Sequence, residues 1–567
     1  MRIIPKMQKV TYSDETFDIR ELSEYSIAPQ LAIAKDILEE LLWSKLAKLE
    51  NSKIASVAKK TKATASDEKK SDGENCSSCS NSTVTKGATL VVNFDASQPA
   101  EGYKLTVAKS GITICASAYK GVLYAIQSLR VGTKIDCKKP IFSLSCFVAN
   151  DFPQYEWRGE MLDESRHFFG KAAVLRLLDI MSLNKLNVFH WHLTDDQGWR
   201  IEIKKYPLLT TIGSKREKSG IHGWQSIDDD GTPHSGFYTQ DDIKEIVAYA
   251  QKLGIDIVPE IDMPGHFAAA FAAYSHLACR DIKVDVPWYF GGKYPSTHGQ
   301  KDWNRSACIG KKSTYEFVFD VIDEIVSLFP FPYFHIGGDE APKEEWKTCP
   351  DCQALMREKG LANINQLQCY FINEVAEYLK TKNRTLLGWN EVLEGNILDK
   401  STLVQYWTDR KDKAVKKHLD KGGRVLLSKH KFFYFDMCYC QYPLSNTYEF
   451  SPYFDGIKKK HASQIVGVEG EMWTEWVGDV YKMDFQLFPR MQALAEVAWN
   501  NKDKDFDEFL TRIESYHDIL DSFGVNYAET EIAQPKGKAF RAKETMLWYS
   551  QNQDRELERN RELKKNK

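Results

Sequence analysis

The sequence contains no run of about 18 apolar residues, the length that an α-helix needs to cross a bilayer, so we expect no membrane span. The 76 basic and 79 acidic side chains leave a net charge of −3. No global field therefore favours nucleic acid or an anionic membrane as a partner. The first 25 residues show no apolar segment with a cleavage site, so no signal peptide is predicted. The compartment stays open: intracellular, or lysosomal or secreted if the start is processed.

Motifs of several common enzyme classes are also missing. We find no Gly-x-Gly-x-x-Gly fingerprint, P-loop or Gly-x-Ser-x-Gly elbow in the context that each requires. The sequence also lacks a His-Glu-x-x-His pattern, which would indicate a catalytic metal. We therefore expect no cofactor and no metal.

The twelve cysteines include two Cys-x-x-Cys pairs, Cys76/Cys79 and Cys349/Cys352. Roughly 270 residues separate these pairs, much more than in a zinc ribbon. We therefore interpret the cysteines as free thiols or disulfides. Cys279–Cys308 is the preferred disulfide if the compartment is oxidising.

The N-terminal part, expected to form a domain over residues 1–152, has a small α+β pattern. Helical spacing at 28–50 precedes a Lys/Ser-rich tract at 51–87, which cannot bury much apolar surface and is interpreted as an insertion. Three strands and one helix are expected to follow, at 89–96, 103–110, 111–117 and 118–132.

From Trp157 onward the pattern alternates between strand and helix. The candidate strands are 157–163, 187–193, 256–262, 333–339, 385–390, 403–407, 424–428 and 465–473. Helical spacing occurs at 170–183, 239–253, 313–328, 363–382, 411–420 and 485–499. This order predicts a (β/α)8 TIM barrel over 153–530. Residues 531–567 are expected to be a charged tail, whose end at 551–567 is a solvated helix or disordered.

Polar or aromatic side chains directly follow each predicted strand. The loops at the C-terminal ends of barrel strands share one rim, so these side chains should converge. Any one alone is compatible with a helix cap or a buried ion pair, but together they favour a functional rim. They are Asp163, Arg166, His192, Asp195, Asp196, Glu260, Asp262, His266, Asp339, Glu340, Trp389, Trp407, Tyr434, Asp436, Trp473 and Glu475.

Tryptophans combined with acids and an arginine suit a carbohydrate, because sugars have apolar faces and hydroxyl edges. Glycosidase carboxylates usually flank the scissile bond about 5–10 Å apart, whereas Asp339 and Glu340 are neighbours. Successive side chains of an extended chain point in opposite directions, so only one of the two can readily meet the leaving-group oxygen. Glu340 has the longer arm and is the natural general acid. Asp339 could then orient a 2-acetamido group that itself attacks C1.

His192, Asp196 and His266 are a conceivable metal set. We prefer a carboxylate–imidazole hydrogen-bond chain, since no metal-binding pattern supports the alternative.

The chain resembles glycoside hydrolase family 20, the β-N-acetylhexosaminidases, over roughly residues 85–500. The motifs that carry the resemblance occur in family order. They are LDESRHFF (162–169), HWHLTDDQGWR (190–200), PEIDMPGH (259–266), HIGGDE (335–340), GWNE (388–391), QYW (405–407), YFD (434–436) and MWTE (472–475).

The resemblance implies a role for each matching position. Glu340 would be the general acid/base, Asp339 would orient the acetamido group, and Tyr434 would bind its oxygen. Arg166 would bind the sugar 3- and 4-hydroxyls. The remaining implied roles are the 4- and 6-hydroxyl contacts of Asp436 and Glu475, the −1 subsite walls Trp389, Trp407 and Trp473, and a relay towards the catalytic acid from His266 with Asp195 or Asp196.

We therefore expect an exo-acting, retaining β-N-acetylhexosaminidase that removes terminal β-linked GlcNAc or GalNAc from glycans or chitooligosaccharides by substrate-assisted catalysis. Two alternatives stay open. One is a carbohydrate-binding protein on an inactive barrel, and the other is a two-carboxylate glycosidase that uses Glu340 with Glu475 or Glu260. The sequence leaves the linkage, the natural substrate and a homodimer undecided.

Overall fold

The computed structural model describes residues 2–40, 88–136, 141–222, 228–290, 306–408, 412–454, 456–502, 504–550 and 553–566. By its contacts the chain divides into two compact units. The first comprises Met1–Gln154, Leu183–Lys185 and Asp507–Val525, and the second comprises Tyr155–Ser182, Leu186–Phe506 and Asn526–Lys567. The domain boundaries expected from the sequence stay a prediction. The expected insertion at 51–87 lies outside the described residues.

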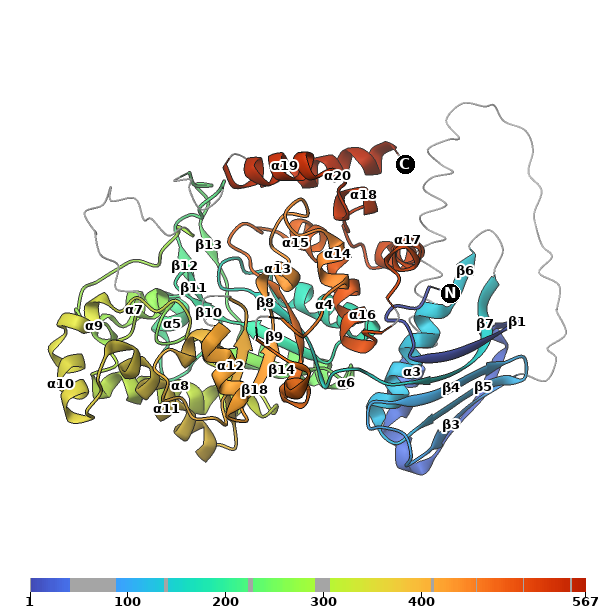
Figure 1. The fold of residues 1–567 in the computed structure, drawn as a ribbon, viewed down its shortest axis with the longest axis horizontal. Coiled ribbons are helices and arrows are strands. Elements are labelled where there is room, and N and C mark those ends of the chain that lie inside the picture. The colour runs from blue at the N-terminus through green and yellow to red at the C-terminus, as the bar shows by residue number, and fades with distance from the viewer. Residues whose placement is uncertain are drawn as a thin grey trace. The chain divides into compact units, whose positions relative to one another are not determined.

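The first unit is built on a seven-stranded mixed sheet (Figure 1). Its order is β1-β7-β4-β5-β3-β2, and β6 pairs with β7. Helix α3 (Tyr119–Gly132) packs on this sheet and is buried from Gly121 to its end. The strands are β1 (Lys9–Asp18), β2 (Leu22–Ile27), β3 (Ala88–Phe94), β4 (Tyr103–Ala108), β5 (Gly111–Ala116), β6 (Lys134–Asp136) and β7 (Ile141–Asp151).

Strands β3, β4 and β5 and helix α3 confirm the elements predicted there, while the sequence analysis missed β1. Its side chains are mostly exposed and polar, so the strand lacks the apolar alternation on which the prediction depends. The helix predicted at 28–50 is wrong in its first part. That part is a 3-10 helix, Pro29–Ala34, followed by the short α1 (Lys35–Leu38). Residues 41–50 lie outside the described part.

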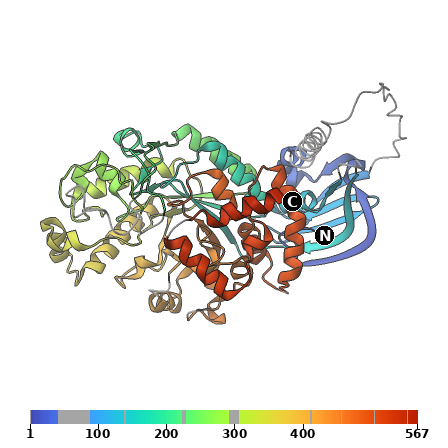
Figure 2. The same cartoon turned by 90° about the horizontal axis from the view of Figure 1, so that it is seen from above.

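The second unit contains a closed barrel of eight parallel strands, which confirms the predicted (β/α)8 fold. Figures 1 and 2 show these strands with their helices from two directions. The strands are β8 (Trp157–Asp163), β9 (Val188–His192), β14 (Asp256–Glu260), β15 (Tyr333–His335), β16 (Thr385–Trp389), β17 (Leu403–Tyr406), β18 (Arg424–Leu427) and β19 (Ile465–Met472).

The predicted barrel helices are present, with one correction. The expected helix at 485–499 is two helices, because Pro489 lacks the N–H that a continuous helix would need. The helices are α4 (Lys171–Leu183), α6 (Gln240–Lys252), α8 (Lys312–Val326), α11 (Ile364–Thr381), α12 (Asp412–Asp420), α15 (Val480–Leu487) and α16 (Arg490–Trp499). Within the described ranges, no helix has the length and apolar character to cross a membrane.

Two side-chain layers fill the barrel interior. The lower one is apolar and consists of Trp157, Val188, Val258, Leu387, Leu403, Leu426 and Val466, with Tyr333 packed against it. Strand residues two positions apart share a face, so the next inward residues lie above this layer. On five strands they are His190, Glu260, His335, Trp389 and Gln405. The apolar layer therefore supports a polar layer directly below the catalytic end.

The C-terminal segment folds into helices α18 (Thr530–Ala533), α19 (Lys538–Ser550) and α20 (Arg555–Asn566). Glu556 of α20 is buried and accepts hydrogen bonds from the backbone N–H groups of Tyr439 and Cys440, both at 2.8 Å. Asn560 is fully buried and accepts from the backbone N–H of Glu529 at 2.8 Å. The helix that was one of the two expected forms of this tail is present, but only part of its surface is solvated, because these groups anchor one of its faces.

The described cysteines are all free thiols. The predicted Cys279–Cys308 disulfide is therefore absent from this structure. Cys76 and Cys79 lie outside the described residues. Cys349 and Cys352 lie beside Cys279 and Cys308.

Candidate active site

Glu260 at the end of β14 is the centre of the polar layer inside the barrel. Its Oε2 lies 3.0 Å from His190 Nε2 and 2.5 Å from His192 Nδ1. Its Oε1 lies 2.9 Å from His335 Nδ1 and accepts from Trp389 Nε1 at 2.9 Å. Burial alone would raise the pKa of Glu260, but the three histidines hold it well below the usual value. Glu260 is thus a saturated, ionised carboxylate, which disfavours it as a nucleophile.

Asp195 joins this layer to the rim. Its Oδ2 lies 3.0 Å from His192 Nε2 and 2.8 Å from Arg166 Nη2, and its Oδ1 lies 3.1 Å from His266 Nδ1. Asp196 Oδ2 is 3.6 Å from the same histidine nitrogen, and its Oδ1 accepts from a backbone N–H. Asp195 is therefore the hydrogen-bonding partner of His266. Hydrogen bonds connect His192, Asp195 and His266. This is a carboxylate–imidazole chain of the kind that we preferred to a metal set, with Asp195 in the place of Asp196.

Both members of the Asp195–His266 pair have displaced pKa values. Burial alone would raise the pKa of Asp195, but Arg166 and His266 hold it well below the usual range. Burial alone would lower the pKa of His266, but Asp195 and then Asp196 hold it well above the usual value. His266 is consequently a cation at neutral pH, close to the end of β15.

The two adjacent acids follow β15, which ends at His335. Gly337 and Gly338 have φ values of 64° and 88°, and Glu340 has a φ of 40°. A Cβ at Gly337 would lie 1.9 Å from Asp262 Oδ1, so only glycine fits there. The expected strand to residue 339 is therefore too long. Asp339 and Glu340 leave the strand through a left-handed turn, and strand alternation is not what separates them.

Asp339 is the more enclosed of the two acids, with a side chain 13% exposed, whereas Glu340 is exposed. Asp339 Oδ2 lies 3.6 Å from His266 Nε2. Its Oδ1 is buried and has no hydrogen-bond partner among the described residues. Burial raises the pKa of Asp339 to about 6, with the His266 charge opposing and the Glu340 charge adding to the shift. The chain from Asp195 through His266 thus ends at Asp339, whereas the sequence analysis expected it to lead to Glu340, the predicted catalytic acid.

Four aromatic rings form a continuous wall. Trp389 and Trp473 have centroids 5.8 Å apart, and Tyr434 lies 6.2 Å from Trp473. Tyr434 also stacks on Trp407, at 5.8 Å and 16°. The wall joins the last residue of β16, the residues directly after β17 and β19, and one residue from the segment after β18, so it brings together the predicted aromatic set. Such a surface can pack against the apolar face of a sugar.

Glu391 is an acid to which the sequence analysis gave no role. It accepts from Trp407 Nε1 at 2.9 Å. Burial raises its pKa to about 8, and the charges of Asp339 and Glu340 add to this shift. Its position directly after the predicted fifth strand, in GWNE, was an available signal. A third, protonated carboxyl therefore lies near the pair at neutral pH.

Arg166 and two acids form the opposite end of the site. Arg166 Nη1 lies 3.2 Å from Asp163 Oδ2, Nη2 lies 4.0 Å from Glu475 Oε1, and the guanidinium lies 5.1 Å from the Trp473 ring centroid. Asp436 is 7% exposed, and its Oδ1 has no partner among the described residues. Burial and then the charge of Glu475 raise the pKa of Asp436 well above its usual value.

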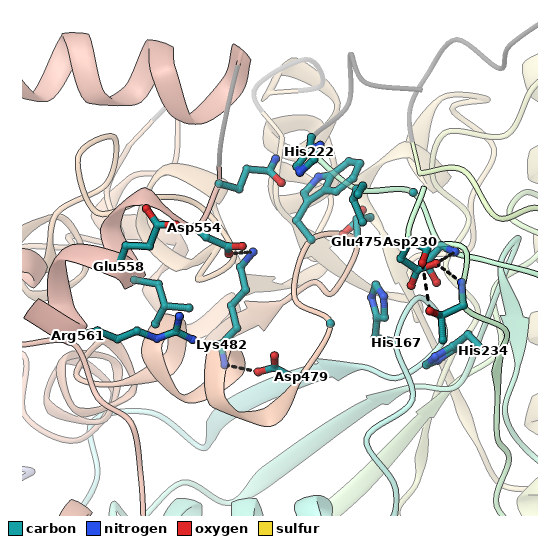
Figure 3. Close-up of a pocket in the computed structure, with 18 residues that line it drawn as sticks. His167, His222, Asp230, His234, Glu475, Asp479, Lys482, Asp554, Glu558 and Arg561 are labelled. Carbon is teal, nitrogen blue, oxygen red and sulfur yellow. Dashed lines mark hydrogen bonds and ion pairs between the residues drawn. The ribbon is translucent and has the colours of Figure 1, made fainter. Parts of the chain in front are cut away.

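A cavity of 590 Å³ continues from Glu475 (Figure 3). Its walls come from the loops after β8 and β19, from residues 219–222 and 230–234, and from α15 and α20. Neither Asp339 nor Glu340 lines it. Polar lining residues that Figure 3 labels are His167, His222, Asp230, His234, Asp479, Lys482, Asp554, Glu558 and Arg561.

Comparison with known families decides what this barrel is. The model of the glycosyl hydrolase family 20 catalytic domain matches residues 155–502, and the model of domain 2 of that family matches residues 1–142. The chain belongs to glycosyl hydrolase family 20. The family 20 catalytic match covers all eight barrel strands and every site residue that the sequence analysis predicted, while the cavity residues of α20 lie beyond it.

Several family 20 proteins are similar over most of the chain. A beta-hexosaminidase of Porphyromonas gingivalis is 34% identical over 474 residues, which span 80% of this chain but 58% of that protein. A beta-hexosaminidase of Akkermansia muciniphila is 30% identical over 77% of this chain and 87% of its own length. The crystal structure of the GH20 exo beta-N-acetylglucosaminidase of Vibrio harveyi with N-acetylglucosamine matches with a TM-score of 0.75 and 30% identity, covering 93% of this chain and 78% of that one.

Proposed function

We propose that this family 20 protein is an exo-acting, retaining β-N-acetylhexosaminidase for terminal non-reducing β-linked GlcNAc or GalNAc. The observation that carries the proposal is the buried Oδ1 of Asp339, which has no partner among the described residues and lies close to Tyr434 of the aromatic wall. A buried carboxylate oxygen without a donor is costly, and an acetamido N–H would supply the donor. The names of the similar proteins, beta-hexosaminidase and exo beta-N-acetylglucosaminidase, agree with this activity.

In the first step, the acetamido carbonyl oxygen attacks C1 while the Glu340 carboxyl gives its proton to the departing glycosidic oxygen. The acetamido nitrogen becomes positively charged in the oxazolinium that forms. Asp339, as a carboxylate, accepts its N–H and stabilises that charge. Tyr434 donates its hydroxyl proton in a hydrogen bond to the attacking oxygen. Cationic His266, with its Nε2 3.6 Å from Asp339 Oδ2, favours the ionised form of Asp339.

In the second step, water attacks C1 from the face that the leaving group vacated. The Glu340 carboxylate takes the proton from this water, and the C1–oxygen bond of the oxazolinium breaks. Two inversions leave the β-configuration unchanged. Glu340 suits both proton transfers because its side chain is exposed.

The sugar would lie with one face on the aromatic wall and its 3-, 4- and 6-hydroxyl edge at Arg166, Asp436 and Glu475. Asp436 Oδ1 is buried without a partner among the described residues, so a hydroxyl donor would satisfy it. The cavity beside Glu475 would hold groups beyond this edge. The sequence made no choice of linkage or of GlcNAc over GalNAc, and a homodimer remains an expectation.

The test compares an aryl N-acetyl-β-glucosaminide with the matched aryl β-glucoside, which lacks the acetamido group. Substrate assistance predicts turnover of the first and a rate lower by at least about 100-fold on the second. Equal rates would contradict the proposal. Covalent trapping of a glycosyl-enzyme would favour the two-carboxylate alternative, and sugar binding without turnover of either substrate would favour the inactive barrel.

A further inference from the structure

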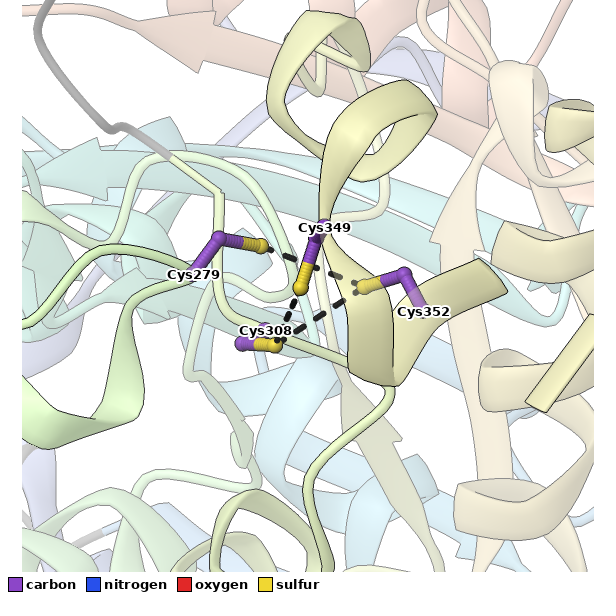
Figure 4. A group of neighbouring side chains, drawn as sticks. All are labelled: Cys279, Cys308, Cys349 and Cys352. Carbon is purple, nitrogen blue, oxygen red and sulfur yellow. Dashed lines mark hydrogen bonds between the residues drawn. The ribbon is translucent and has the colours of Figure 1, made fainter. Parts of the chain in front are cut away.

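Four cysteines from distant parts of the chain converge outside the active site (Figure 4). Their sulfur atoms all lie within 4.8 Å of one another. Cys308 Sγ is 3.5 Å from Cys349 Sγ and 3.8 Å from Cys352 Sγ, and Cys279 Sγ is 3.9 Å from Cys352 Sγ. Cys308, Cys349 and Cys352 are buried, and Cys279 is half-buried. Four cysteine sulfur atoms so close together, three of them from buried residues, require a common explanation.

The sulfur separations identify that explanation. A disulfide places its sulfurs about 2.05 Å apart. A tetrahedral zinc ion with Zn–S bonds of about 2.3 Å places its ligand sulfurs about 3.8 Å apart. The observed 3.5, 3.8 and 3.9 Å match the second geometry. We propose that Cys279, Cys308, Cys349 and Cys352 bind one structural Zn²⁺ ion.

The backbone delivers the sulfurs as two pairs. Cys349 and Cys352 have the Cys-x-x-Cys spacing of zinc ligands, and Cys349 is the N-cap residue of α10 (Pro350–Glu358). Cys279 and Cys308 each follow one residue of the antiparallel Ala278–Ala307 bridge, so both side chains lie on the same face of that bridge. The sequence analysis rejected zinc because it paired Cys349/Cys352 with Cys76/Cys79. The second pair of ligands is instead contributed by a long loop.

The surroundings suit a thiolate cluster. A Cβ at Gly310 would lie 2.3 Å from the Cys352 nitrogen, so a larger residue would push the two pairs apart. Lys311 Nζ donates to the Ala278 carbonyl at 2.7 Å, and its charge offsets part of the negative charge of a four-thiolate zinc centre.

The proposed ion would join two loops that frame the catalytic residues. Cys279 and Cys308 belong to the segment after β14, and Cys349 and Cys352 follow the segment after β15 that carries Asp339 and Glu340. Trp346 Nε1 donates to the Ala307 carbonyl at 2.9 Å, and Ser306 Oγ donates to the Pro342 carbonyl at 2.8 Å. All four positions of the ion are filled by protein sulfur, so it would stabilise the fold and take no part in the chemistry.

The first experiment measures metal in the full-length protein, purified without added metal or chelator. We expect about one zinc per chain by elemental analysis, and Cys349→Ser and Cys352→Ser should each reduce it at least about 5-fold. Cys115→Ser, which changes a half-buried cysteine outside the cluster, should keep the full zinc content. Substoichiometric zinc in the wild-type protein, below about 0.2 per chain, would overturn the proposal.

The second experiment needs no variant that might misfold. The wild-type protein is denatured with a chelator and an alkylating agent, without reductant, and its peptides are mapped. Zinc ligation predicts that all four cysteines are alkylated, and that chelator lowers the unfolding midpoint of the native protein by at least about 5 °C. Disulfide-linked peptides joining any two of the four cysteines would overturn the proposal. An unfolding midpoint that is the same with and without chelator would also overturn it.

Discussion

Glu260 and Asp339 are both enclosed carboxylates at the catalytic end of neighbouring barrel strands, yet their surroundings are opposite. Glu260 has three histidines and an indole N–H around its two oxygens, and its pKa is held well below normal. Asp339 has one oxygen without a partner in the part of the chain that the structure describes, and its pKa rises to about 6. The difference separates an acid that is surrounded by donors of the protein from one whose donor, in the proposed function, would come with the substrate.

A chain of contacts connects the side chains around Glu260 with those around Asp339. Glu260 orders His192, His192 meets Asp195, and Asp195 holds His266. His266 in turn approaches Asp339. The buried network around Glu260 thus positions the side chains around Asp339, as expected of a site built on a rigid support.

The largest expected effect is on the acid that serves the leaving group. Glu340→Gln cannot donate a proton, so kcat on substrates with poor leaving groups should fall by at least about 100-fold. Activated aryl substrates, whose leaving groups need little protonation, should lose much less. Steady-state kinetics on both substrate types measures the contrast.

Glu344→Gln is the matched control for Glu340→Gln, because Glu344 is an exposed acid only four residues away. It should change kcat by less than about 2-fold. Equal losses in both variants would contradict the acid role of Glu340.

Replacing Glu260 should change the free energy of unfolding. Glu260→Gln leaves three buried histidines without their common partner, and we expect unfolding to become easier by about 3–5 kcal/mol. Denaturant unfolding of the full-length protein measures this change. Unaltered stability in the variant would remove the distinction between Glu260 and Asp339.

Asp339→Asn should have the opposite effect on stability. It removes a carboxylate that is costly to ionise, so the variant should gain on the order of 1–3 kcal/mol at pH 7 while losing most N-acetylhexosaminidase activity. Parallel unfolding and activity measurements would test this exchange. A variant that loses both activity and stability would show that Asp339 is structural as well.

The smallest effect is a pH dependence. Asp339 must be ionised to accept the acetamido N–H, so kcat should rise with pH along an acid limb near pH 6. The contribution of Asp339 to the free energy of unfolding changes with pH in the opposite direction to kcat. The folded pKa of about 6 exceeds the ordinary 3.8, so the folded state binds more protons between these values and stability falls as pH rises through them. Asp339→Asn should flatten that slope, and a slope unchanged in the variant would assign it to another group.

The sequence was sufficient to predict the barrel because its strands are continuous buried runs and its helices have clear apolar periodicity. It could not choose between Asp195 and Asp196, because a single residue shift decides which carboxylate faces His266. It also missed the turn at Gly337 and Gly338, since a left-handed backbone depends on the close approach of Asp262. The four-cysteine cluster was hidden because loop closure brings together cysteines that are far apart in sequence.

Helix α20 has a consequence for specificity. Residues such as Glu558 and Arg561 line the same cavity as Glu475, while Glu556 and Asn560 anchor the helix from its other side. The anchored face and the cavity face can therefore change independently. Exchanging only the cavity-facing residues between family members offers a route to altered glycan preference that leaves the barrel and its catalytic acids untouched.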